Sequence, residues 1–145
     1  MLITTRAAEI ATTAHAGVFR TCGQPYIAHP AWVAGWLNHN GYSADIQAVA
    51  WLHDVVEDTD LALTDLLRLG IPNRLVDAVD ALTRRPDEDY YEAVQRAAHH
   101  PIGRIVKVAD NIHNTLPEQM TCFAPSVRNR KMTKYAQARA ILTAA

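Results

Sequence analysis

Four side chains in this sequence have the residue types of a metal site. His53 and Asp54 are adjacent near the end of an apolar segment, and His29 stands directly before Pro30. Asp110 lies inside another apolar segment, where an unpaired buried carboxylate would cost several kcal/mol. A cation shared by His29, His53, Asp54 and Asp110 would remove that cost, and a metal-free polar network is the alternative.

The donor set indicates which ions would fit. Two imidazoles and two carboxylates without a thiolate suit Mn²⁺ or Fe²⁺ and tolerate Zn²⁺, Co²⁺ or Ni²⁺. Four protein ligands leave open positions on an octahedral ion for water and a phosphate oxygen. A second ion would need further histidines, but none lies between His53 and His99. We therefore predict one divalent metal ion.

Two acidic residues follow the His-Asp pair at helical spacing. Glu57 comes four residues after His53, and Asp58 comes four residues after Asp54. One more helical turn would place both acids beside the ion. Acids in the last turn of a helix oppose the helix dipole, which favours a functional role over a solvated helix end. A carboxylate so placed can accept a proton from water activated by the ion.

A basic, an acidic and an amide residue share one predicted helix face. Lys107, Asp110 and Asn114 stand at positions i, i+3 and i+7, which form a single stripe. A cation near the metal could stabilise charge on phosphate oxygens. The alternative for Lys107 is a surface lysine whose stem covers apolar residues.

These motifs resemble the HD-domain phosphohydrolases, and most of all the RelA/SpoT-type hydrolase domains and the small stand-alone alarmone hydrolases. The chain reads PYIAHP at 25–30, LHDVVEDT at 52–59 and VKVADNIHN at 106–114, in the family's order. LTRRPDEDY at 82–90 resembles a stretch of small bacterial relatives. The likeness runs from about residue 5 to 140.

The resemblance implies a role for each site residue. The metal ligands would be His29, His53, Asp54 and Asp110, and the ion would be Mn²⁺. Glu57 and Asp58 would position or deprotonate the attacking water. Arg20, Lys107 and Asn114 would contact the substrate. The implied reaction removes the 3′-pyrophosphate of (p)ppGpp, the alarmone of the stringent response, or of a related nucleotide.

Two departures from the family pattern concern the substrate. The alarmone hydrolases usually have Gln-x-Arg-Lys where this chain has Val18-Phe19-Arg20-Thr21, and Pro117 stands where a Thr is frequent. One alternative is therefore a hydrolase of the same chemistry that acts on NADPH, a nucleoside monophosphate or another small phosphate. The other is a non-catalytic nucleotide-binding module. Arg20 could also be an ordinary loop residue.

The elements expected to position these residues are all helical. Apolar residues recur with the helical period, and no segment alternates like a strand. We predict one all-α HD-type bundle of about seven or eight helices over residues 1–145. The expected helices cover 2–15, 30–39, 44–56, a short stretch from about 64 to 70, 72–82, 90–99, 102–116 and 129–145. His15 is expected to be a capping histidine or a buried one with its hydrogen bonds satisfied. His113, three residues after Asp110, is expected to be packed, with support of a metal ligand as the alternative. Tyr135 is expected either to dock the last helix on the core or to edge the pocket.

Composition narrows the class of protein. The chain has 145 residues, is 49% hydrophobic and 20% charged, and carries a formal net charge of −1. These values are typical of a globular domain and argue against nucleic-acid binding, which needs a basic face. Without a signal peptide or a long apolar run, we expect a cytoplasmic protein that has no membrane contact. Cys22 and Cys122 are expected to be free thiols, with a disulfide as the alternative. The oligomeric state is left open.

Overall fold

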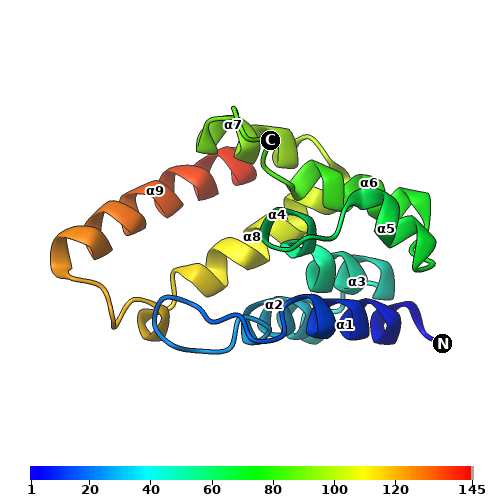
Figure 1. Cartoon of the computed structure of the whole chain (residues 1–145). Helices are drawn as coiled ribbons and strands as arrows, with labels where there is room; N and C mark the ends of the chain where they lie inside the picture. The colour runs from blue at the N-terminus through cyan, green and yellow to red at the C-terminus, as the bar shows by residue number, and fades with distance from the viewer. Residues whose placement is uncertain (145) are drawn as a thin grey trace.

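The computed structural model describes residues 1–144 and is all helical, as predicted (Figure 1). The helices are α1 (Ile3–Ala14), α2 (Ala28–His39), α3 (Ala44–Leu52), α4 (Val55–Asp58), α5 (Leu63–Arg68), α6 (Asn73–Leu82), α7 (Tyr90–Ala98), α8 (Pro101–Asn114) and α9 (Pro125–Ala144), with a 3₁₀ turn, η1 (Pro117–Gln119). An isolated bridge between Phe19 and Pro25 is the only β pairing within residues 1–144. These nine α-helices of the described residues exceed the expected seven or eight mainly because one predicted helix is divided in two.

Helix α8 lies at the centre of the bundle. It packs against α2, α3, α6, α7 and α9, so one face of it meets the core and another faces α9. The main core gathers small and branched apolar side chains, among them Val33, Leu37, Leu52, Leu75 and Val106, all fully buried. This arrangement places the 106–114 segment next to α2 and α3, which carry the other candidate ligands.

The long helix α9 is attached to the bundle through a smaller apolar cluster. Val94 and Ala98 of α7 are buried against Ala138 and Leu142 of α9. Figure 1 shows α9 reaching α7 with its C-terminal half, while its N-terminal half extends toward the η1 turn. Between residues 1 and 144, no helix combines the length and apolarity needed to cross a membrane.

The predicted helix over 44–56 is interrupted at the His-Asp pair. Helix α3 ends at Leu52, and α4 begins at Val55, with His53 and Asp54 between them. The Nδ1–H of His53 donates to the carbonyl oxygen of Ala50 at 2.6 Å, which caps the end of α3. In a continuous helix, adjacent side chains point about 100° apart. The interruption therefore lets both side chains face the same point.

Candidate metal centre

The four predicted ligand residues meet at one point although they come from three parts of the chain. His29 projects from the first turn of α2, His53 and Asp54 from the α3–α4 junction, and Asp110 from α8. One donor atom from each lies within 4.8 Å of every other. His29 Nε2 is 2.8 Å from Asp110 Oδ1 and 3.5 Å from Asp54 Oδ2, and His53 Nε2 is 3.0 Å from Asp54 Oδ2. This convergence has the size of a metal coordination sphere.

The residues present fit a bound divalent ion. His53 is 2% exposed, yet its Nε2 makes no hydrogen bond, although Asp54 Oδ2 lies only 3.0 Å away. Its Nδ1–H is donated to a carbonyl, so displacement of the Nε2 proton by a bound ion would direct the Nε2 lone pair at the cluster. A buried lone pair and two carboxylates aimed at one point are the donor set that such an ion requires.

The electrostatics of the cluster also favour a positive charge there. Burial alone would lower the pKa of His53, but Asp54 and Asp110 raise it well above its usual value. Burial would raise the pKa of Asp110, but Lys107, His29 and His53 hold it well below its usual value. Burial would likewise raise the pKa of Asp54, but His53 and His29 hold it below its usual value, so both aspartates are ionised at neutral pH, as metal ligation requires.

Two further side chains, which the sequence analysis did not assign to the site, hold the ligands in place. The Tyr26 hydroxyl donates to Asp54 Oδ2 at 2.7 Å. The Nδ1 atoms of His29 and His113 are 2.6 Å apart, within hydrogen-bond distance, and burial lowers the pKa of His113 to about 4. The ring of His113 is stacked between His29 and Trp32. His113 is thus packed, as expected, and it also contacts the His29 ring on the side away from the cluster.

His15 differs from the expectation for it. The ring is 2% exposed and lies 4.8 Å from the Tyr26 ring, centroid to centroid. Neither nitrogen of the ring has a hydrogen-bond partner, so the side chain is buried but is neither a cap nor a hydrogen-bonded core group.

The acidic pair lies beside the cluster on α4. Carboxylate oxygens of Asp54, Glu57 and Asp58 all lie within 4.8 Å of one another. Glu57 Oε1 accepts the backbone N–H of Arg84 at 2.7 Å, which fixes this side chain. Desolvation in the cavity wall and the charge of Asp54 raise the pKa of Asp58 to about 6. Asp58 is therefore the acid of this pair that is better suited to exchange a proton near neutral pH.

The loop that holds Glu57 is itself clamped by an arginine. Arg96 of α7 grips Glu88 with two hydrogen bonds, of 2.9 and 2.8 Å, and donates to the carbonyl oxygens of Asp80, Ala81 and Thr83. Because these contacts span both ends of the 83–89 loop, they set the position of the Arg84 N–H and hence of Glu57.

Replacing Glu88 with glutamine is expected to lower the free energy of unfolding by about 1.5–3 kcal/mol at pH 7, since a charge-assisted hydrogen-bonded pair is lost. The hydrogen bonds from Arg96 lower the pKa of Glu88 to about 2 from its ordinary 4.5. The stabilisation is therefore complete above pH 4.5 and is lost as the pH falls toward 2. Urea unfolding of wild type and Glu88→Gln at several pH values measures this, with exposed Glu9→Gln as control. A difference between the two proteins that is independent of pH would contradict the assignment.

The three predicted substrate-binding residues line the same cavity as His29 and the carboxylates of the candidate metal ligands. Arg20 donates to Asn114 Oδ1 at 2.9 Å, and Asn114 donates to Asp110 Oδ1 at 3.2 Å. Lys107 Nζ is 3.0 Å from Asp110 Oδ2, so it is an ion-paired lysine of the site rather than a surface one. All three face a hollow of about 550 Å³ that also contains His29, Asp54, Glu57, Asp58 and Asp110.

Helix α9 contributes one wall of this cavity, and the sequence did not predict the lysines on that wall. Lys131, Lys134 and Tyr135 line it, together with Tyr90 of α7. Tyr135 was expected to dock the last helix, and it does face the site as well. A period-3.6 pattern cannot show that these lysines face a cavity, because the same pattern describes a solvated helix face.

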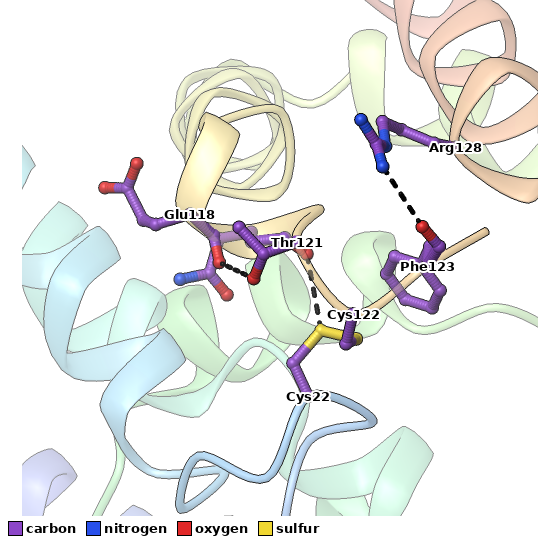
Figure 2. The surroundings of a disulfide bond; sticks show 7 residues. Cys22, Glu118, Thr121, Cys122, Phe123 and Arg128 are labelled. Carbon is purple, nitrogen blue, oxygen red and sulfur yellow. Dashed lines mark hydrogen bonds between the residues drawn. A yellow bond between two sulfur atoms is a disulfide. The ribbon is translucent and has the colours of Figure 1, made fainter. Parts of the chain in front are cut away.

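A disulfide closes the rim of the cavity, so the expectation of two free thiols is wrong. Cys22 lies in the α1–α2 loop and Cys122 between η1 and α9, with a Cα–Cα distance of 5.3 Å. Figure 2 shows the bond joining these two segments, with Cys22 Sγ near the backbone that follows α8. Spacing in the sequence could not reveal the pairing, because it depends on how two distant loops fold together. Both loops line the cavity, through Arg20 and Phe123 among others.

Replacing both cysteines with serine is expected to destabilise the oxidised protein by about 2–5 kcal/mol, because the bond closes a loop of 100 residues. Denaturant unfolding with and without a thiol reductant measures this. The reductant should bring wild type to the stability of the Cys22→Ser/Cys122→Ser variant and leave the variant unchanged. Two titratable thiols per chain in the native, unreduced protein would contradict the disulfide.

Comparison with known proteins agrees with this geometry. A family model described as the HD domain matches residues 7–145. A probable GTP pyrophosphokinase of Mycobacterium leprae is 37% identical over 137 residues, which cover 89% of this chain and 17% of the relative. The mouse guanosine-3′,5′-bis(diphosphate) 3′-pyrophosphohydrolase MESH1 is 41% identical over 98 residues, which cover 63% of this chain and 55% of the relative. The chain thus spans between about a sixth and about half of these curated relatives.

A solved structure has the same fold. It belongs to a metazoan orthologue of SpoT that hydrolyses ppGpp, and it superposes with a TM-score of 0.84 at 22% sequence identity. The match covers 98% of this chain and 86% of the other. At that identity the likeness supports the helical architecture.

Proposed function

Because the chain belongs to the HD-domain family, we propose that it is a metal-dependent phosphohydrolase that removes the 3′-pyrophosphate of (p)ppGpp or of a closely related nucleotide. The observation that carries the proposal is the convergence of His29, His53, Asp54 and Asp110 at the floor of a cavity lined by cations. The relatives whose names state this reaction support the choice of substrate.

The proposed ligands are these four residues, and Mn²⁺ is the proposed ion. A divalent ion bound there would act as a Lewis acid on the phosphate and promote deprotonation of water. Manganese is favoured over zinc because two carboxylates among four ligands make a hard donor set. We expect one ion per chain.

The remaining steps belong to side chains of this chain. Asp58 accepts a proton from the attacking water, and Glu57, held by the Arg84 N–H, orients that water. Lys107 is paired with Asp110, and its charge stabilises the phosphate oxygens as the bond between the 3′-phosphorus and the ribose 3′-oxygen breaks. The 3′-oxygen leaves as a hydroxyl by taking up the proton that Asp58 accepted, and the pyrophosphoryl group is released as pyrophosphate. Arg20 and Asn114 bind the nucleotide at the cavity wall.

Purified protein supplied with Mn²⁺ and ppGpp should release GDP and pyrophosphate in equal amounts, and EDTA should stop the reaction. A panel containing NADPH and nucleoside monophosphates should be run in parallel. Hydrolysis of another member of the panel without ppGpp turnover would show that the substrate is that compound, and the proposed metal-dependent phosphohydrolase reaction would stand. Nucleotide binding without turnover in the presence of Mn²⁺, Fe²⁺, Co²⁺ and Zn²⁺ would contradict the proposed enzymatic activity. The protein would then be a non-catalytic nucleotide-binding module.

A second substrate class is favoured by one specific feature of the cavity. Val18, Phe19 and Thr21 flank Arg20 on its wall, where the alarmone hydrolases usually carry a glutamine and a lysine. This wall is less polar and less basic than theirs, and the Phe19 side chain is 64% exposed. A phosphorylated metabolite with a larger apolar part would fit it, so NADPH belongs in the panel.

A cytoplasmic location stays part of the proposal, as the compartment in which such nucleotides occur. Disulfides are rare in reducing compartments. The Cys22–Cys122 bond therefore weighs against this location, and the thiol titration described above bears on it as well.

A further inference from the structure

The disulfide joins two segments that both line the cavity (Figure 2). One is the stretch 18–22 of the α1–α2 loop. The other runs from η1 into α9 and lines the cavity with Gln119, Met120, Phe123 and Lys131. We call these two stretches, residues 18–22 and 119–131, the rim segments. Nothing in the proposed reaction uses the bond that joins them.

The second rim segment has few other attachments to the rest of the protein. No side chain between residues 121 and 133 is buried, and the first buried residue of α9 is Ala138. The side-chain contacts of this stretch are local, such as Arg128 to the carbonyl oxygen of Phe123 and Lys131 over the Phe123 ring. Within residues 1–144, the disulfide is the one covalent or hydrogen-bonded connection of this stretch to the α1–α2 loop.

The first rim segment connects the disulfide to the candidate site through Arg20. This side chain donates to Asn114 Oδ1 at 2.9 Å, and Asn114 donates to Asp110. Cys22 lies inside the turn that follows Arg20, which is closed by the Arg20 N–H on the carbonyl oxygen of Gln24 at 2.7 Å. Breaking the disulfide would therefore free this turn as well as the second rim segment. Side chains that are free before binding must be ordered by the ligand, which costs affinity.

The metal centre is positioned independently of the disulfide. Its four candidate ligands come from α2, the α3–α4 junction and α8, which pack against one another through the main core. None of the four lies in a rim segment. Loss of the bond should therefore change the cavity rim and leave the ligand cluster in place.

The disulfide is accessible to a reductant. Cys122 is exposed and Cys22 is half-buried. Exposed disulfides are typically labile, and those of reducing compartments are mostly transient or redox-sensing. A dithiol attacks Cys122 Sγ as a thiolate and expels Cys22 Sγ, which takes up a proton. The second thiol of the reductant then attacks the mixed disulfide and releases Cys122. The protein gains two electrons and two protons, and the reductant becomes a disulfide.

We propose that the Cys22–Cys122 bond is a redox switch of nucleotide affinity. In the oxidised protein the joined rim segments are ordered before the nucleotide arrives, and binding is tight. Reduction by a dithiol separates the rim segments and weakens nucleotide binding, while the metal centre is unchanged. The inference concerns regulation of the site described above and rests on the proposed function for the identity of the ligand.

The test compares oxidised protein with protein reduced by dithiothreitol, which is removed under nitrogen before Mn²⁺ is added. Reduction should raise the KM for guanosine 3′,5′-bis(diphosphate) about tenfold, the cost of ordering two or three long side chains, with kcat within about twofold. Reoxidation should restore the first value. The control variant Cys22→Ser/Cys122→Ser should have the reduced value before and after the same treatment.

Two measurements separate the switch from a general loss of stability. The Mn²⁺ affinity of the oxidised and reduced proteins should agree within about twofold. At short labelling times, hydrogen exchange should become faster in the rim segments on reduction, while α3 and α6 stay protected. A parallel loss of Mn²⁺ affinity, or early exchange that spreads to α3 and α6, would overturn the inference.

Calorimetry on EDTA-treated protein keeps the inference separate from the proposed function. Guanosine 3′,5′-bis(diphosphate) should bind about tenfold more weakly to the reduced protein than to the oxidised one. That result in a protein that hydrolyses no nucleotide would disprove the reaction and retain the switch. Turnover with the same KM in both redox states would overturn the switch and leave the reaction standing.

Discussion

Replacing Asp54 with alanine is expected to abolish both metal binding and hydrolysis. Its carboxylate is one of four converging donors, 3.0 Å from His53 Nε2 and 3.5 Å from His29 Nε2. Loss of a group that merely supports a ligand already weakens metal affinity 10–100-fold, so loss of a ligand should weaken it by more than about 100-fold. Turnover should fall at least about 10⁴-fold, because the ion supplies the Lewis acid.

Metal content after dialysis and calorimetric titration with Mn²⁺ measure the first effect, and pyrophosphate release measures the second. Asp60→Ala is the matched control, because Asp60 is an exposed acid two residues beyond α4 and outside the cluster. Circular dichroism must show that Asp54→Ala is folded. A folded Asp54→Ala protein that keeps one tightly held ion per chain would remove the assigned metal centre.

The four candidate metal ligands could be proposed from the sequence because each belongs to a short motif that resembles one of the HD-domain family. His29 begins a helix before Pro30, and Asp110 sits on an apolar face that cannot tolerate an unpaired charge. Local rules therefore identified the four residues. Their meeting point depends on how α2, α3 and α8 pack, which the structure supplies.

The interruption between α3 and α4 could not be predicted in the same way. The apolar period continues through residues 44–56 and favours one helix. In the structure, His53 caps α3 through the carbonyl of Ala50, and the site requires His53 and Asp54 to face one point. A tertiary requirement has overridden local helix propensity here, as is common at functional sites.

The supporting residues depend on contacts across long stretches of sequence. Tyr26 reaches Asp54 over 28 positions, His113 reaches His29 over 84, and the disulfide joins residues 100 positions apart. Tyr26 and His113 stand within the PYIAHP and VKVADNIHN motifs, but their spacing does not show which distant side chains they contact. The lysines of α9 are similar, since only the tertiary position of α9 shows that they line the cavity.

Removing the two acids of α4 separately should give unequal losses of activity while metal binding is kept. Asp58→Asn should lower kcat by about 10²–10⁴-fold, the usual contribution of a general base, because an amide cannot accept the proton. Glu57→Gln should lower kcat by about tenfold, because the amide oxygen still accepts the Arg84 N–H and keeps its position. The pH profile adds a test: the pKa of Asp58 is raised to about 6 in the metal-free protein and a bound cation lowers it, so the base becomes protonated below pH 6. Wild-type kcat should therefore fall as the pH drops below 6, and in Asp58→Asn this limb should disappear.

The order of the two losses discriminates between roles for the acidic pair. If Glu57 were the base, Glu57→Gln would show the larger loss and would flatten the acidic limb, while Asp58→Asn would retain it. If the acids served as metal ligands, both variants would lose Mn²⁺ together with activity, as Asp54→Ala should. Metal titration of the three variants therefore separates proton transfer from coordination. The structure favours Asp58 because Glu57 is already engaged by a backbone donor, whereas the Asp58 carboxylate lies beside Asp54 at the cavity wall.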